Sequence, residues 1–65
     1  MELAEKILSE LVLRIENHFN LDPMDALEAV ALSKLGNRIA QGEYDHSLTL
    51  DQLAEELYRE VATAR

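Results

Sequence analysis

The two histidines are the side chains of this 65-residue chain best suited to hold a metal or to transfer protons. Neither His18 nor His46 has a second histidine four residues away, the spacing of a zinc-binding helix. His18 falls near the end of an expected helix, where a partly charged imidazole suits the helix dipole. His46 follows Asp45 in an expected loop. We therefore expect both histidines to be structural, and no metal to be bound.

Oxygen-bearing side chains between residues 45 and 56 follow the spacing of a calcium-binding loop only in part. Positions 1, 3, 5, 7 and 12 of such a loop would be taken by Asp45, Ser47, Thr49, Asp51 and Glu56. Position 6 needs glycine for a sharp turn, and the chain has Leu50 there. Thr49 and Gln52 also match a helix start inside the supposed loop. These residues therefore predict no calcium site.

Acidic pairs such as Asp51 with Glu55, and Glu56 with Glu60, fall on the polar side of an expected helix. Paired acids perform acid–base chemistry only in a cleft that perturbs their pKa values, and three short helices leave little room for one. No serine has a neighbouring base, and Gly36 and Gly42 alone cannot form a glycine-rich phosphate loop. We expect a non-enzymatic protein with no catalytic residue and no cofactor.

Small residues follow one another in steps of three and four along residues 23–40, which keeps them on one stripe of a helix. This small-residue stripe consists of Ala26, Ala29, Ser33, Gly36 and Ala40. The same segment carries a stripe of large apolar residues: Met24, Leu27, Ala31, Leu35 and Ile39. We interpret residues 23–40 as a central helix that is packed from both sides. The first and third helices would cover the large stripe, and a second copy of the chain would approach the small one.

The small-residue stripe thus predicts a homo-oligomer, in the simplest case a two-fold dimer. Leu13 lies on the polar side of the first expected helix and is added to this interface. The predicted interface comprises Ala26, Ala29, Ser33, Gly36, Ala40 and Leu13.

The elements that position these residues are three expected helices, over residues 2–19, 23–40 and 50–62. Asp22 suits an N-cap before Pro23, and Gly42 suits the residue that ends a helix. Thr49 and Gln52 form a capping box at the start of the last helix. The sequence therefore predicts an all-α fold: one domain over residues 1–65, a three-helix bundle with a two-sided central helix that dimerisation completes.

Composition limits the classes of function. A chain of 65 residues buries only about 60% of its unfolded surface, and without cysteine it has no disulfide to support it. The net charge of −7 disfavours binding to nucleic acid and to anionic membranes, and permits a basic partner protein. Charged residues interrupt the apolar runs near the N-terminus, and no run approaches the roughly 20 residues of a membrane span. We expect a cytoplasmic protein.

One stretch resembles a known family. Ile39 to Glu43, followed by Thr49 to Leu53, is similar to the end of small antitoxins that inhibit Fic-type toxins. The inhibitory helix of those antitoxins carries serine or threonine with glutamate four residues later. In this chain Asn37 follows Ser33 at that distance, and Leu53 follows Thr49. We assign the chain to no family on this resemblance.

These observations favour a small acidic regulatory protein, antitoxin-like or inhibitor-like, that acts as a homo-oligomer and binds a partner protein. The alternative is a DNA-binding transcriptional regulator of the helix-turn-helix type. Its connection would be about eight residues long instead of three or four. Its reading helix would carry four acids against one internal base, Arg59.

Overall fold

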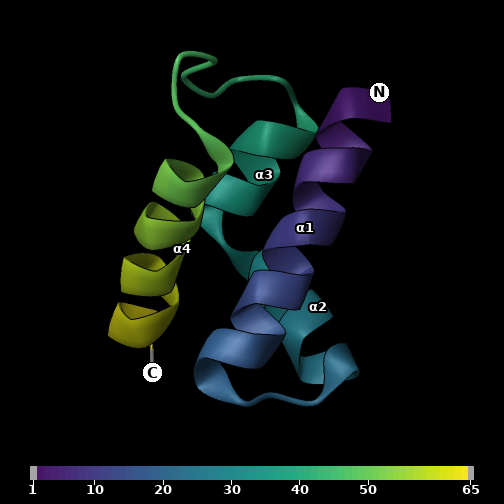
Figure 1. Ribbon diagram of the computed structural model, residues 1–65, viewed down its shortest axis with the longest axis vertical. Coiled ribbons are helices and arrows are strands. Elements are labelled where there is room, and N and C mark those ends of the chain that lie inside the picture. Colours follow the sequence, from purple (N-terminus) through teal and green to yellow (C-terminus); the bar gives the residue numbers. More distant parts are fainter. Residues whose placement is uncertain (1, 65) are drawn as a thin grey trace.

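The chain folds into four helices in a computed structural model, which describes residues 2–64. They are α1 (Glu2–Phe19), α2 (Pro23–Leu32), α3 (Lys34–Ala40) and α4 (Leu50–Ala64). In Figure 1, α1 and α4 run along the molecule with α3 between them at one end, while α2 crosses behind the lower half of α1. The expected all-α class is confirmed. Residues 2–64 form four helices instead of the expected three.

Local signals place most helix ends where the sequence predicts them. The carboxylate of Asp22 accepts a hydrogen bond from the Met24 amide at 3.3 Å, and Pro23 is the first residue of α2. Gly42 ends α3 with a φ of +75°. The amide of Thr49 donates to the Gln52 side chain at 2.8 Å, and the Gln52 amide donates to the Thr49 hydroxyl at 3.2 Å. The Asp22 cap, the Gly42 stop and the capping box before α4 are therefore confirmed.

The expected continuous helix over residues 23–40 is wrong, because the chain breaks at Ser33. The backbone there is extended, with φ −76° and ψ 150°. The Ser33 hydroxyl donates to the Val30 carbonyl at 2.7 Å and accepts from the Gly36 amide at 2.8 Å. One hydroxyl thus serves the end of α2 and the start of α3, which would otherwise leave backbone groups without partners.

The two faces of α2 are also reversed relative to the expectation. Ala26 is fully buried, whereas Met24 is 72% exposed and Leu27 is 53% exposed. The small residues of α2 therefore pack inward, where their size lets α1 approach closely. The large residues meet the core only beyond the break, where Leu35 is half-buried and Ile39 is buried.

The core is formed by large apolar side chains of α1, α3 and α4 around the small face of α2. Its buried members are Leu11, Ile15, Ala26, Val30, Ile39, Leu53, Ala54, Leu57 and Val61. On its border the ring of His18 stacks on that of Tyr58, with centroids 3.9 Å apart. Arg14 and Asp51 form an ion pair at 2.5 Å between α1 and α4.

Candidate interaction surfaces

The residues predicted to contact a second copy do not form one exposed surface. Ala26, Ser33 and Gly36 are buried inside the single chain, Ala29 is half-buried, and Ala40 and Leu13 are exposed. The buried members of the small-residue stripe already have a packing role within the monomer. Contact between the stripe and a second copy stays a prediction.

Gly36 shows why a small residue is needed at the break. A Cβ atom added to it would clash with the carbonyl oxygen of Val30 and lie 2.6 Å from the Ser33 hydroxyl oxygen. Glycine thus permits the end of α2 and the first turn of α3 to pack against each other. The space beside Gly36, where a second copy of the chain was expected to approach, is filled by Val30 and Ser33 of the same chain.

Large apolar side chains exposed to solvent gather on α2. Leu32 is 77% exposed, in addition to Met24 and Leu27. Met24, Leu27 and Ala31 are spaced at i, i+3 and i+7, which places them on one side of the helix. We call these three exposed residues the apolar row. Because Met24, Leu27 and Leu32 expose three large apolar side chains on a helix of only ten residues, α2 is a candidate interaction surface.

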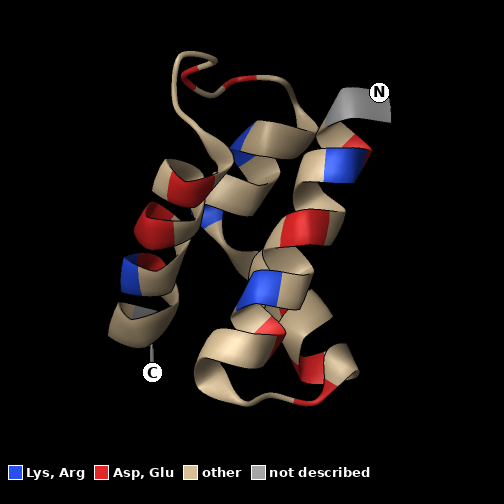
Figure 2. Cartoon of the chain, in the orientation of Figure 1, with Lys and Arg blue, Asp and Glu red and all other residues tan. Residues whose placement is uncertain are grey.

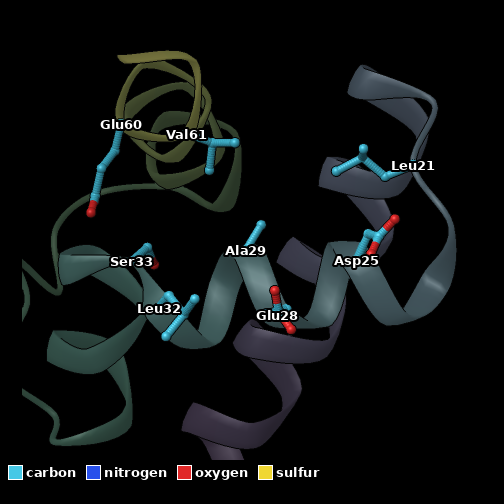
Figure 3. Close-up of a pocket in the computed structure, with 8 residues that line it drawn as sticks. All are labelled: Leu21, Asp25, Glu28, Ala29, Leu32, Ser33, Glu60 and Val61. Atoms are coloured by element: carbon cyan, nitrogen blue, oxygen red, sulfur yellow. The ribbon is translucent and has the colours of Figure 1, made fainter. Parts of the chain in front are cut away.

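A groove of about 510 Å³ lies between α2 and the C-terminal half of α4. Figure 3 shows the side chains of Ala29 and Ser33 directed from α2 toward α4, with Val61 opposite and Leu21 at one end. Leu32 and Glu28 lie along its outer edge in the same view. The lining residues are Leu21, Asp25, Glu28, Ala29, Leu32, Ser33, Glu60 and Val61. We call this feature the α2–α4 groove.

The α2–α4 groove has an apolar floor and an acidic rim. Its lining combines four apolar side chains with three carboxylates, and no Lys or Arg belongs to the described residues that line it. The carboxylate of Glu60 accepts hydrogen bonds from the amides of Lys34, at 2.5 Å, and Leu35, at 3.1 Å. Asp25 and Glu28 are exposed and lie in no ion pair with another residue of the 2–64 range. The rim therefore carries uncompensated negative charge.

The residues considered for metal or acid–base chemistry make local structural contacts. A ring nitrogen of His46 lies 3.3 Å from the Gly42 carbonyl oxygen, and its ring packs against that of Tyr44. The Asp45 carboxylate accepts hydrogen bonds from the Ser47 hydroxyl and from the Ser47 amide. These hydrogen bonds, chiefly the one from the hydroxyl, lower the pKa of Asp45. Within residues 2–64, no three His, Cys, Asp or Glu side chains lie close enough together to hold a metal ion.

Charge is not sorted into a basic face. Figure 2 shows the few lysines and arginines scattered over α1, α3 and α4, with acidic residues on every helix except α3. On α4, the helix that would read DNA, Asp51, Glu55 and Glu56 are all exposed. No helix among residues 2–64 is both long enough and apolar enough to cross a membrane.

Comparison with known protein families, with curated proteins and with solved structures gave no match.

Proposed function

We propose that this chain is a small non-enzymatic regulatory protein that acts as a homodimer and binds a basic partner protein. The observation that carries the proposal is the exposure of Met24, Leu27 and Leu32 on one ten-residue helix. Apolar side chains gathered in this way are typical of surfaces that other proteins cover. The charge of −7 favours a basic partner over an acidic one.

The dimer contact is assigned to the apolar row of α2. Met24, Leu27 and Ala31 form a strip about 10 Å long on the helix, from the rise of 1.5 Å per residue. Two such strips from two copies pack against each other about a two-fold axis, because such an interface pairs a surface with itself. A chain of 65 residues without cysteine also has more to gain from association than a large domain has.

Sedimentation equilibrium of the full chain over a wide range of concentrations tests the dimer. The wild type is expected to move from the monomer mass to twice that mass as its concentration rises. The double variant Met24→Ser with Leu27→Ser is expected to remain a monomer, and its helical circular dichroism should be unchanged because both side chains are exposed. The matched control is Leu13→Ser, which removes an exposed leucine from α1.

Two outcomes separate the parts of this proposal. A wild type that stays monomeric at every concentration contradicts the dimer. A dimer that resists the double variant but is lost in Leu13→Ser instead places the contact on α1. Partner binding is measured separately, by the experiment that follows from the α2–α4 groove.

A further inference from the structure

We propose that the α2–α4 groove binds an amphipathic helix of basic character from a partner protein. The inference rests on the proposed function and adds to it a binding site and the chemistry of what occupies the site. It follows from the lining of the groove, from its dimensions and from its charge.

The lining requires an occupant with two kinds of side chain. Leu21, Ala29 and Val61 form an apolar floor, which loses contact with water when apolar side chains enter. Asp25 and Glu28 project from α2 beside this floor, and Glu60 lies on α4 with its carboxylate directed toward the start of α3. A segment with a row of apolar residues flanked by Lys or Arg satisfies both parts. An acidic or purely polar segment satisfies neither.

The occupant is a helix because of the elements that form the groove. The described residues contain no β-strand, so there is no sheet edge to which an extended peptide could add. Asp25 and Leu32 are seven residues apart on α2, about 10 Å along the helix axis. A partner helix with apolar residues at i, i+3 or i+4, and i+7 has anchors over the same length. Because the side chain of Ala29 is short, the backbone of the partner helix can approach the floor of the groove closely.

A second copy of this chain does not suit the groove. Its rim carries the exposed carboxylates of Asp25 and Glu28. A two-fold contact centred here would bring these carboxylates close to those of the other copy, where they would repel each other. The apolar row used for the proposed dimer lies on the adjoining face of α2, so the dimer and the groove use different residues.

The test uses a fluorescent peptide of about 15 residues, because shorter helices are marginal in water. It contains leucine, alanine and lysine, with leucines at i, i+4 and i+7 and lysines on both flanks of that row. A second peptide has the same composition in scrambled order and cannot form an apolar face. Fluorescence anisotropy gives the affinity of each for the full chain, and amide chemical shifts give the location of the bound peptide.

The amphipathic peptide is expected to bind at least about tenfold more tightly than the scrambled one, with the largest shifts at Leu21, Ala29 and Val61. Raising the salt concentration should weaken its binding, because the ion pairs at the rim are exposed. Equal affinity for the two peptides, or shifts spread over the whole acidic surface, overturns the proposal, because the attraction would then be one of net charge alone. Absence of binding overturns it as well.

Variants with little effect on folding test the individual parts. Leu32→Ala removes an exposed wall of the groove and should weaken binding by about threefold to tenfold. Its control is Leu13→Ala on α1, which should leave the affinity unchanged. The pair Asp25→Asn with Glu28→Gln should weaken binding by about threefold to tenfold, whereas Glu5→Gln with Glu43→Gln removes the same charge elsewhere and should not. Equal losses in a variant and its control contradict the groove as the site.

The double variant Met24→Ser with Leu27→Ser separates this inference from the proposed dimer. If that variant is a monomer and still binds the peptide, the two surfaces act independently, as proposed. If the wild type never dimerises but binds the peptide at the groove, only the dimer fails. If the wild type dimerises without binding the peptide, only the groove proposal fails.

Discussion

Gly36 has no room for a side chain. Its position within a segment of regular helical spacing gives no sign of this constraint. A methyl group on this residue clashes with the Val30 carbonyl oxygen and crowds the Ser33 hydroxyl. That hydroxyl cannot rotate away freely, because it donates to one backbone group and accepts from another. The position is therefore closed to any side chain, although the backbone itself is helical.

Gly36→Ala is accordingly expected to destabilise the protein. Alanine has a higher helix propensity than glycine, by about 1 kcal/mol, but the overpacked break outweighs this gain. We expect a net loss of about 1–3 kcal/mol in the free energy of unfolding, measured by urea denaturation at a fixed protein concentration.

Gly42 provides the control for this substitution. It has a φ of +75°, and no other atom lies within 4 Å of the position that a Cβ would take. Asparagine tolerates this conformation, so Gly42→Asn should cost less than about 1 kcal/mol. A Gly36→Ala protein at least as stable as the wild type would contradict the break at Ser33 and favour a continuous helix.

The sequence predicts the roles of some single residues and not of others. Asp22, Gly42 and Thr49 act through neighbours within a few positions, so the sequence predicts their roles correctly. Ser33 is equally local, and serine is a better cap than an interior helix residue. The spacing nevertheless conceals the break, because apolar residues continue at helical intervals on both sides of it.

At the scale of elements, Glu60 connects α4 to the start of α3. Its two carboxylate oxygens accept hydrogen bonds from the amides of Lys34 and Leu35, which belong to the first turn of a helix with no acidic residue of its own there. A carboxylate at this place both satisfies free amides and interacts favourably with the helix dipole. The break at Ser33 thus depends on a side chain that lies 27 residues further along the sequence.

Glu60→Ala is therefore expected to loosen α3. We expect a loss of about 1–2 kcal/mol in the free energy of unfolding, the upper part of the range for helix caps. Hydrogen exchange of the Lys34 and Leu35 amides should accelerate more than that of amides in the middle of α1.

Two further variants of α4 test whether Glu60 acts as a cap of α3. Glu60→Gln keeps one oxygen acceptor and should recover part of the loss. Glu56→Ala removes an exposed carboxylate of the same helix that receives no hydrogen bond from α3, and it should leave exchange at Lys34 unchanged. Equal acceleration in Glu56→Ala and Glu60→Ala would mean that Glu60 acts through general charge and not as a cap.

Helix packing explains why the sequence predicts the elements better than their faces. On α2 the small and large residues repeat with the same helical period, so spacing alone does not tell which side is buried. The structure buries the small side, represented by Ala26, and exposes Met24 and Leu27. The α2–α4 groove could not be predicted either, because it depends on where Val61 and Glu60 lie relative to α2.

The stability of the whole molecule depends on its association if the proposed dimer forms. If two copies bury the apolar row in each other, unfolding also separates the copies, and the melting temperature must depend on concentration. A tenfold rise in concentration is equivalent to about 1.4 kcal/mol per dimer.

For two chains of 65 residues with average unfolding enthalpies, this free energy corresponds to a rise of roughly 5 °C in melting temperature. We expect that rise for the wild type, measured by circular dichroism at two concentrations tenfold apart. The variant Met24→Ser with Leu27→Ser should melt at the same temperature at both concentrations, because a monomer that unfolds without association has no such dependence. A wild type whose melting temperature is equally insensitive to concentration is not a dimer over that range, and Met24 and Leu27 would then be free on the monomer for another protein to cover.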